Sequence, residues 1–413
     1  MALTTIASLT QAEKIVWART TLKEARNVSF IEKFVGKDQN SYIQRISEFS
    51  KSEKGATARI HLLHNLVNPG AMGDTTLWDN EEALVASFED VKIDQIRNAN
   101  RLKGRLTDQK SVLNFRTESR DVLAYWMANT VDTLAFKTMS GIDYRIKLNG
   151  ALETGYTYTS GAPDTGWNAS SGSGLTFADL EFGAYVSAPS SLRGYRWDTG
   201  TSALVARDVT AVAAADTMSY ETIVRLKAMA KEKYLRGVRG AGGEEEFLLI
   251  VGPRSMANLR LDSDFLANAR ALQTGMGDKG QLASGAGGVL VNGVRVIESR
   301  YVYNTLGATT LSSANHEGDP GRKWGTNGAA VDGERCLFLG AQALAYADMG
   351  LPNWDEQMWD YDNQTGIAIG KIIGMKKTIF KTTYEANDTS TTFAGGGTIN
   401  GQDFGILTCD VAV

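Results

Sequence analysis

Two histidines are the first candidates for chemistry in this sequence. His61 and His64 form an H-x-x-H pair, a spacing that can ligate zinc. The pair falls at the end of a predicted strand, Ala56–Leu63, and residues three apart on a strand point to opposite faces. No third Cys or His ligand lies nearby in the sequence. We therefore expect these histidines to pack or to form hydrogen bonds, and we predict no metal site.

Histidine is scarce in the chain, and this bears on the class of protein. His61, His64 and His316 are the only 3 histidines in 413 residues. A metal enzyme, or an enzyme with histidine-based acid–base catalysis, would have to use one of them. We predict that the protein is not an enzyme. We assign no catalytic, cofactor-binding or metal-binding residue, and we expect no cofactor.

Carboxylates near the C-terminal end support one alternative. Asp355, Glu356 and Asp360 stand close to Trp354 and Trp359. Aromatic side chains with carboxylates suggest a carbohydrate cleft, and two carboxylates at the right separation can hydrolyse a glycosidic bond. The spacing in the sequence does not fix that separation, and no nucleophile motif accompanies it. A carboxylate-based glycan hydrolase therefore stays an alternative from a different class.

A glycine-rich loop suggests phosphate binding, but its context argues against it. Gly240, Gly242 and Gly243 follow a predicted helix (216–236) and precede an apolar run (247–251) that predicts a strand. Phosphate loops run from a strand into a helix, so that the amides of the helix start face the anion. Because the order here is reversed, we predict no phosphate site.

The bulk composition argues against several further classes. A net charge of −4 does not fit a protein that binds nucleic acid through a basic face. Cys336 and Cys409 are too few for a disulfide framework and fit a reducing compartment. Glu13, Lys14 and Arg19 interrupt the first twenty residues, so we expect no signal peptide, and no apolar run is long enough to span a membrane. We expect assembly in the cytoplasm.

The stretch 246–302 predicts a rigid structural unit. Its apolar run forms a buried strand, and Gly252-Pro253 ends this strand and opens a helix. Asn292-Gly293 between two β-rich runs predicts a tight hairpin, because both turn residues need a positive φ. Nothing in this unit resembles a reaction site. We interpret it as a wedge that presents a surface.

Two long elements are predicted before residue 150. Residues 55–104 predict a hairpin excursion whose returning strand begins at Val91 and runs to Ile96. A two-stranded hairpin is marginally stable in water, so it needs another surface to lie on. Residues 108–140 predict one long helix with an apolar face at i, i+3 and i+4 spacing and Gly141 as its C-terminal stop.

The N-terminal part predicts an arm with one helix. Thr10 and Glu13 form a capping box at the start of that helix. The helix either docks on its own subunit or packs on a neighbouring one, and the residues favour neither.

The C-terminal half ends in strands and loops. Residues 366–380 predict strands in which Lys376-Lys377 is exposed, and the tail from Glu385 predicts an arm or a small β-element. The Gly-rich and polar segments 150–210 and 304–333 predict surface loops.

The order of several motifs resembles the major capsid proteins of tailed bacteriophages in the N-four-like podovirus lineage. An acidic Glu-Glu-x-Leu element leads into a v-x-i-d-q strand, and a long helix with an L-x-x-W…D pattern follows. The residues that carry these motifs here are Glu81, Glu82, Leu84, Val91, Ile93, Asp94, Gln95, Leu123, Trp126 and Asp132. At the helix entry the chain has Asn114-Phe-Arg116 in place of the family's Asp-x-Arg. The Gly340-x-x-Ala343-Leu344 element and the strand up to Lys377 are also similar, and the resemblance covers residues 55–380.

The resemblance implies an α+β fold of the Hong Kong 97 type. It assigns residues 1–54 to an N-terminal arm and 55–104 to the extended E-loop hairpin. It assigns 105–215 to a peripheral domain with a spine helix (108–140) and a loop insertion. Residues 216–350 would form the axial domain, and 351–413 would return to the peripheral domain and end in the C-terminal tail.

The resemblance also implies a function. A major capsid protein self-assembles, as hexamers and pentamers, into the icosahedral head shell of the virion and encloses double-stranded DNA without sequence-specific binding or a membrane. Because no long charged helix precedes the arm, a separate scaffolding protein is expected, with a portal and a decoration or cement protein as further partners. The shell of a cellular nanocompartment, which encloses an enzyme, is an alternative with the same fold. A surface adhesin would carry long β-repeats, and the sequence has no internal repeat.

Overall fold

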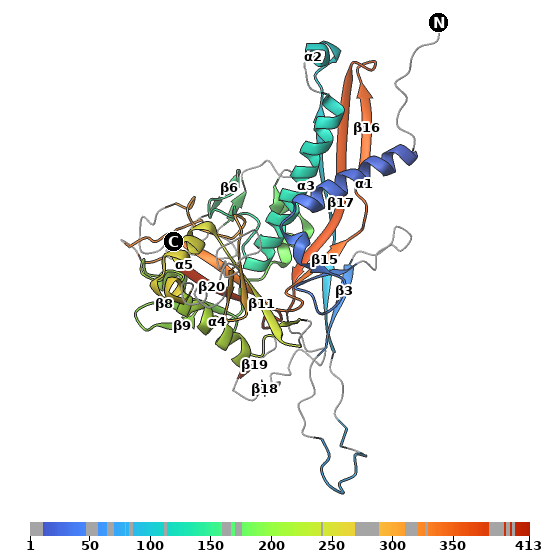
Figure 1. The fold of residues 1–413 in the computed structure, drawn as a ribbon. Coiled ribbons are helices and arrows are strands. Elements are labelled where there is room, and N and C mark those ends of the chain that lie inside the picture. The colour runs from blue at the N-terminus through green and yellow to red at the C-terminus, as the bar shows by residue number, and fades with distance from the viewer. Residues whose placement is uncertain are drawn as a thin grey trace, which may run out of the picture.

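A computed structural model gives the fold (Figure 1). It describes residues 11–46, 57–63, 70–78, 80–81, 86–110, 114–158, 167–169, 176–240, 243–268, 289–309, 321–326, 329–379, 392–393, 397–398 and 401–413. Two sheets form the body of the molecule. A hairpin projects from one end of this body, and α2 and the β16–β17 turn lie at the opposite end.

The first sheet has six strands and packs against two helices. Its order is β1, β2, β15, β17, β16, and β5 also pairs with β17. The bounds are β1 Val35–Gly36, β2 Ile43–Ile46, β5 Asp94–Arg101, β15 Leu344–Asp348, β16 Asn353–Trp359 and β17 Gln364–Lys377. Ile367, Ile369 and Ile373 of β17 share one apolar core with α1 (Gln11–Val28) and α3 (Phe115–Ser140).

The second sheet has eight strands in the order β12, β13, β11, β14, β20, β8, β9, and β10 pairs with β11. The bounds are β8 Gly194–Asp198, β9 Ala203–Ala206, β10 Val238–Arg239, β11 Glu245–Val251, β12 Val289–Val291, β13 Val294–Glu298, β14 Gly333–Leu339 and β20 Ile406–Ala412. One face packs with α4 (Tyr220–Glu232) and α5 (Pro253–Leu261). Leu248 and Ile250 on the other face join the core that contains α3, so the two sheets share that core.

The structure confirms the strand, the helix and the tight hairpin that were predicted within 246–302. The apolar run forms β11, Gly252 is the N-cap of α5, and Pro253 is its first residue. Asn292 and Gly293 have φ values of 47° and 74° between β12 and β13, as the tight turn requires. The unit lies inside the second sheet: β11 pairs with β13 on one side and with β14 on the other.

The hairpin differs from the prediction in its returning strand. β3 (Thr57–Leu63) pairs with β4 (Ala86–Lys92) in an antiparallel ribbon. Asp94 then begins β5, which leaves the ribbon and pairs with β17. The residues predicted as one returning strand are therefore divided between two sheets. Ala58, Ile60 and Val91 at the base of the ribbon are buried, so this base is anchored to the body.

The long helix begins later than predicted. The range 108–140 contains the end of a short helix, α2 (Arg105–Lys110), and then α3, which begins at Phe115. Asn114 is the N-cap of α3, and its side-chain oxygen accepts a hydrogen bond from the Thr117 amide, so the helix start is fixed there. The predicted C-terminal stop is confirmed, because Gly141 has a φ of 64° and closes the helix.

The structure corrects two predictions for the C-terminal half. Lys376 and Lys377 are not exposed: they form ion pairs with Glu89 and Asp403 at 2.6 Å and 2.8 Å, and Lys377 is fully buried. Among the described residues, the arm or small β-element predicted for the tail is present only as the two-stranded pair of β18 (Thr392–Phe393) and β19 (Gly397–Thr398). The last strand of the tail, β20, is buried along its whole length between β14 and β8.

The remaining elements are short. They are η1 Ile31–Phe34, β6 Tyr156–Tyr158, β7 Trp167–Ala169, η2 Phe177–Asp179, η3 Glu181–Tyr185, η4 Val209–Ala211, β18 Thr392–Phe393 and β19 Gly397–Thr398. The described part of the segment predicted as loops (150–210) contains short elements between irregular stretches, and it supplies β8 and β9 to the second sheet. The expected range 105–215 therefore contributes strands to the second sheet, and 351–413 contributes β16 and β17 to the first sheet and β20 to the second.

Candidate functional site

The histidines do not identify a site. His61 lies on β3 opposite Phe88, and His64 and His316 lie outside the described residues. Within the part of the chain that the structure describes, no group of three His, Cys, Asp or Glu side chains is placed to hold a metal ion.

The two cysteines face each other inside the second sheet. Cys336 of β14 is paired with Cys409 of β20, and both are free thiols with no exposed surface. Burial raises the pKa of both thiols well above the usual range. Since the thiolate is the reactive form, both cysteines act as apolar core residues.

The structure does not assemble the carboxylates of the hydrolase alternative. Asp355 and Glu356 are neighbours on β16, so their side chains point to opposite faces. Glu356 accepts hydrogen bonds from Arg116 at 3.0 Å and 2.9 Å and from the Trp354 indole at 3.0 Å. Asp360 lies beyond the strand in the β16–β17 turn, with a φ of 54°. The three carboxyl groups therefore do not converge on one cleft.

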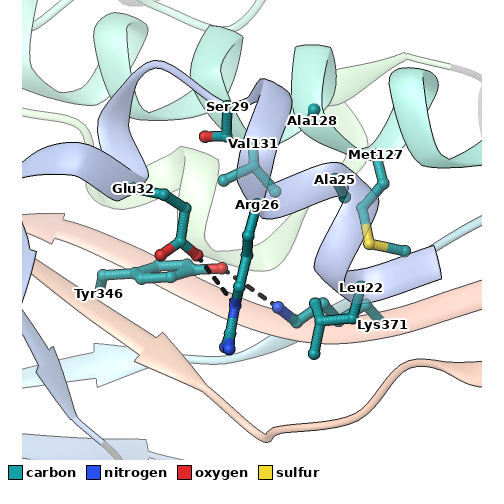
Figure 2. A pocket seen from close by; sticks show the side chains of 10 residues that line it. All are labelled: Leu22, Ala25, Arg26, Ser29, Glu32, Met127, Ala128, Val131, Tyr346 and Lys371. Carbon is teal, nitrogen blue, oxygen red and sulfur yellow. Dashed lines mark hydrogen bonds and ion pairs between the residues drawn. The ribbon is translucent and has the colours of Figure 1, made fainter. Parts of the chain in front are cut away.

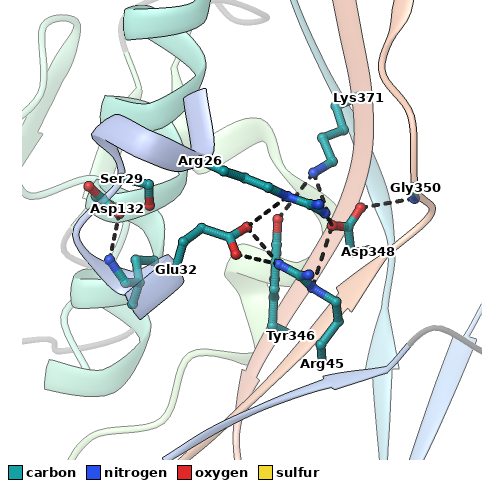
Figure 3. Close-up of polar contacts among 10 residues, drawn as sticks. Arg26, Ser29, Glu32, Arg45, Asp132, Tyr346, Asp348, Gly350 and Lys371 are labelled. Atoms are coloured by element: carbon teal, nitrogen blue, oxygen red, sulfur yellow. Dashed lines mark hydrogen bonds and ion pairs between the residues drawn. The ribbon is translucent and has the colours of Figure 1, made fainter. Parts of the chain in front are cut away.

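Asp132 forms the first of two polar contacts that hold the N-terminal segment on the body. This carboxylate lies on the buried face of α3 and accepts three hydrogen bonds from the chain that follows α1 (Figure 3). The donors are the Ser29 hydroxyl at 2.6 Å, the Phe30 amide at 2.8 Å and the Ile31 amide at 3.2 Å. Burial raises the pKa of Asp132, although these hydrogen bonds oppose the shift.

The second contact is a buried ionic cluster between the N-terminal segment and the first sheet (Figure 3). Arg45 of β2 pairs with Glu32 at 2.6 Å. Asp348 of β15 accepts from Lys371 of β17 at 3.1 Å and from the Gly350 amide at 2.9 Å. Arg26, at the end of α1, lies 3.4 Å from each of the two carboxylates and so links them.

The cluster borders a small cavity between α1, α3 and the first sheet. Figure 2 shows Arg26, Glu32 and Lys371 around the ring of Tyr346, with Met127 and Leu22 on the apolar side. Burial lowers the pKa of Lys371, whereas Asp348 raises it. Burial, and next Asp348, raise the pKa of the Tyr346 hydroxyl well above its usual range. The cavity is lined by groups that already bond one another, so its chemistry is that of a structural junction.

These contacts decide between the two alternatives for the N-terminal helix. Ala18 and Ala25 of α1 belong to the core that contains α3, and Trp17 packs on Trp354 of β16 with ring centroids 5.6 Å apart. The described part of the helix is therefore docked on its own subunit. Residues 1–10 lie outside the described residues.

We predict that removing Asp348 costs far more stability than removing Lys371. The cluster holds three cations and two carboxylates, so Asp348→Asn leaves Glu32 as the one carboxylate and Lys371 without a paired counter-charge. We expect a loss of about 3–5 kcal/mol in unfolding free energy. Lys371→Met leaves Asp348 paired with Arg26 and Arg45 and should change stability by about 1 kcal/mol or less. Denaturant unfolding of both variants measures the difference, and equal losses would contradict the prediction.

The Lys371→Met variant should also differ from the wild type in how its unfolding free energy depends on pH. The pKa of Lys371 is lowered in the folded protein from 10.5. The unfolded chain therefore binds more protons in the window below 10.5, and this group makes the protein more stable as the pH rises through that window. The methionine variant should lack this contribution. Unfolding measured at several alkaline pH values tests the sign.

The projecting hairpin presents apolar side chains where the body offers them no partner. Residues 70–78 lie beyond every other described element at the bottom of Figure 1. Met72, Leu77 and Trp78 are exposed there, with 80% of the Trp78 side chain accessible. An exposed group of large apolar residues on a projection is typical of a contact surface.

The described residues thus form a two-sheet body and a projection with exposed apolar side chains, and they assemble no reaction site. One residue could have indicated the buried ionic cluster from the sequence. Lys371 interrupts the apolar run GIAIGKIIGM (366–375), and a lysine is almost never buried unless it is paired. The partners Glu32, Arg45 and Asp348 come from distant segments, so no spacing pattern identified them.

Comparison with known proteins decides the family. A family model described as "Phage capsid protein" matches residues 5–413. The chain is 43% identical, over 410 residues, to the major capsid protein of Pseudomonas phage KPP25, and the match covers 99% of this chain and 97% of that protein. The chain belongs to the phage capsid protein family.

Solved capsid structures share its fold. The capsid protein of Ralstonia phage GP4 matches with a TM-score of 0.65 at 22% identity, covering 93% of this chain and 91% of that one. The capsid protein of cyanophage Pam1 matches with a TM-score of 0.61 at 14% identity, covering 100% and 96%. At these identities the likeness shows the fold, a mixed α+β arrangement found in phage capsids.

The protein is therefore a major capsid protein of a bacteriophage and a structural component of the virion, as the motif order indicated. It assembles with copies of itself and is not an enzyme. The family favours this function over the nanocompartment shell and over the glycan hydrolase. None of the described helices is long and apolar enough to cross a membrane.

Proposed function

We propose that this capsid protein has the Hong Kong 97-type fold and belongs to the N-four-like podovirus lineage. The observation that carries the proposal is the β3–β4 ribbon, which is anchored at its base and carries exposed apolar side chains at its far end. In this proposal residues 55–104 form the E-loop, which reaches over a neighbouring subunit and buries Trp78 there. A partner subunit then supplies the surface that an isolated ribbon needs.

The two sheets support an assignment of domains. The first sheet, with α3 as the spine helix, forms the peripheral domain, and the second sheet, with α4 and α5, forms the axial domain at the capsomer centre. The N-terminal arm comprises residues 1–54. The axial domain comprises β10, β11, β12, β13 and β14 within 216–350 together with β8, β9 and β20, because these strands form one sheet, whereas β15 (Leu344–Asp348) belongs to the first sheet and so to the peripheral domain.

In the assembled shell, hexamers and pentamers enclose double-stranded DNA in the head, and assembly takes place in the cytoplasm of the bacterial host. The net charge of −4 fits a shell that does not bind the genome through a basic face. We further propose a separate scaffolding protein, a portal and a decoration or cement protein as partners. Their binding surfaces are not assigned.

The function is tested by negative-stain electron microscopy and size-exclusion chromatography of the purified chain, alone and co-expressed with a candidate scaffold. We expect closed shells tens of nanometres across, or pentamers and hexamers. A strictly monomeric or dimeric protein under both conditions would contradict the proposal. Correctly sized shells from the chain alone would contradict only the need for a scaffolding protein.

A further inference from the structure

A buried polar junction lies where the end of α3 meets the second sheet. We define it as Ser140, Ser187, Arg207, Arg335, Thr408 and Asp410. Within it, the Arg335 guanidinium donates two hydrogen bonds to the Asp410 carboxylate, at 2.8 Å and 3.1 Å. The same guanidinium also donates to the Ser140 carbonyl at 3.0 Å. Arg335 and Asp410 are buried, at 3% and 0% exposure, so this charge pair is removed from water.

Arg207 brings a second guanidinium to the same face. Thr408 and Asp410 are two residues apart on β20, so both point to the face that carries the bidentate pair. Thr408 is paired with Gly194 of β8. The aliphatic part of Arg207 covers Gly194, because a Cβ built there would lie 3.3 Å from the Arg207 Cβ and Cδ atoms. Arg207 therefore lies over the residue next to Thr408.

The segment 187–189 closes the junction from the side of α3. A Cβ on Gly141, directly after Ser140, would lie 2.4 Å from the Ser187 carbonyl oxygen and 2.9 Å from Pro189. A Cβ on Gly194 would lie 3.3 Å from the same proline. The segment thus runs between the end of α3 and β8 and brings Ser187 to the junction.

Three hydroxyl groups in this junction lack a partner. The side-chain oxygens of Ser140, Ser187 and Thr408 are buried and form no hydrogen bond with any of the described residues. Buried hydroxyls are nearly always bonded to protein, water or an ion, because an unmade bond costs about 1–3 kcal/mol. Three such groups on segments that the contacts above bring together therefore point to a bound species that satisfies them.

The charge of the junction indicates the sign of that species. Arg207 and Arg335 carry two positive charges against the one negative charge of Asp410. The neighbouring Lys377 pairs with Asp403, and Arg193, directly before Gly194, adds a further buried cation whose Nη1 atom has no partner among the described residues. Burial lowers the pKa of Arg207, and the charge of Arg335 lowers it further. Asp208, the next residue in the chain, is exposed and accepts hydrogen bonds from the Thr210 amide and hydroxyl.

We propose that this junction binds a small inorganic anion, held by the three hydroxyl donors and by the Arg207 guanidinium. Hydroxyls and guanidinium groups donate hydrogen bonds, and an anion accepts them while it offsets the unpaired cation. The bound anion would tie the end of α3, the 187–189 segment and the second sheet together. The site would stabilise the subunit.

The Thr408→Val substitution tests whether the hydroxyl has a partner, because valine has nearly the same shape. If Thr408 donates to a bound anion, the variant should melt about 2–4 °C below the wild type. If the hydroxyl is truly unpaired, its removal should leave the melting temperature unchanged or raise it. Such a result would overturn the proposal.

The anion itself is identified by calorimetry of the full-length protein at constant ionic strength in sodium chloride, sodium phosphate or sodium gluconate. Gluconate is an organic anion much larger than chloride or phosphate and serves as the reference, so we expect a higher melting temperature in chloride or in phosphate than in gluconate, and no such difference for Arg207→Gln. Arg225→Gln is the matched control, since Arg225 is half exposed and pairs with Glu221 on α4. A wild-type melting temperature that is the same in all three salts would mean that only water fills the junction, and the proposal would be wrong.

Discussion

Deleting residues 66–87 is expected to leave a folded subunit that no longer forms stable shells. The residues that anchor the ribbon to the body, including Ala58, Ile60 and Val91, lie outside the deletion. Within it, the side chains of Met72, Leu77 and Trp78 are exposed, so the isolated subunit loses little buried apolar area. A neighbouring subunit, by contrast, would lose the surface that we propose it buries. The effect should therefore fall on assembly and spare the fold.

The measurement has two parts. Circular dichroism and thermal unfolding report whether the deletion variant is folded, and electron microscopy reports whether it forms particles. The single substitution Trp78→Ser should lower the yield of shells in the same direction, because it removes the most exposed apolar side chain of the three. Normal particles from the deletion variant would mean that the hairpin is not the E-loop. An unfolded variant would mean that the hairpin is part of the core.

Replacing Asp132 with alanine is expected to loosen the N-terminal segment and to destabilise the subunit strongly. The substitution leaves the Ser29 hydroxyl and the amides of Phe30 and Ile31 without their acceptor. Each unmet buried donor costs about 1–3 kcal/mol, and the variant regains part of this because no carboxylate is buried. We expect a net loss of about 3 kcal/mol in unfolding free energy.

Asp121→Ala is the matched control on the same helix. Asp121 is partly exposed and pairs with its neighbour Arg120, so its removal should cost about 1 kcal/mol or less. Limited proteolysis should cut within residues 11–46 of the Asp132→Ala variant, while the rest of the chain stays resistant. Equal stability of the two variants would show that the three hydrogen bonds do not hold the segment.

The pH dependence of the stability difference between wild type and Asp132→Ala tests the same contact independently. Burial raises the pKa of Asp132 in the folded state above its usual 3.8. In the window just above 3.8 the folded protein therefore binds more protons than the unfolded chain, and this group lowers stability as the pH rises. The difference in stability between wild type and variant should shrink as the pH rises through that window. Chemical unfolding between acid and neutral pH measures it.

Local chemistry in the sequence determined several elements. The apolar run 247–251, the Gly252-Pro253 step and the Asn292-Gly293 turn each specify their structure through neighbouring residues alone, and the fold confirms them. The stop of α3 at Gly141 is of the same kind, because only glycine adopts a positive φ there without strain. The order of the capsid motifs also indicated the capsid family, and the family comparison then confirmed it over the enzyme alternative.

The predicted start of α3 is too early. The apolar spacing in the sequence continues from α2 into α3, whereas the fold divides this stretch into two helices. Asn114 was noted only as a departure from the family motif, although Asn is a preferred N-cap. Trp126 lies on the predicted apolar face but is only half buried, since the positions of the covering elements decide which part of a helix face is covered.

Tertiary structure alone decided where the charges and the last strand lie. Asp348, Lys371 and Lys377 are buried because oppositely charged partners pair with them, up to several hundred residues away in the chain, and Asp132 is buried because three donors of the N-terminal segment satisfy it. No local pattern encodes such a pairing. The tail lacks Lys and Arg from Glu385 onward, a composition that predicts an arm or a small β-element, yet its last strand, β20, lies between β14 and β8 inside the second sheet. Short-range patterns fix turns, caps and strand faces, whereas long-range pairing fixes which strand is central and which charge is buried. The sequence by itself therefore determined the family and the local elements of this capsid protein, and only the tertiary structure placed its buried ionic cluster and its polar junction.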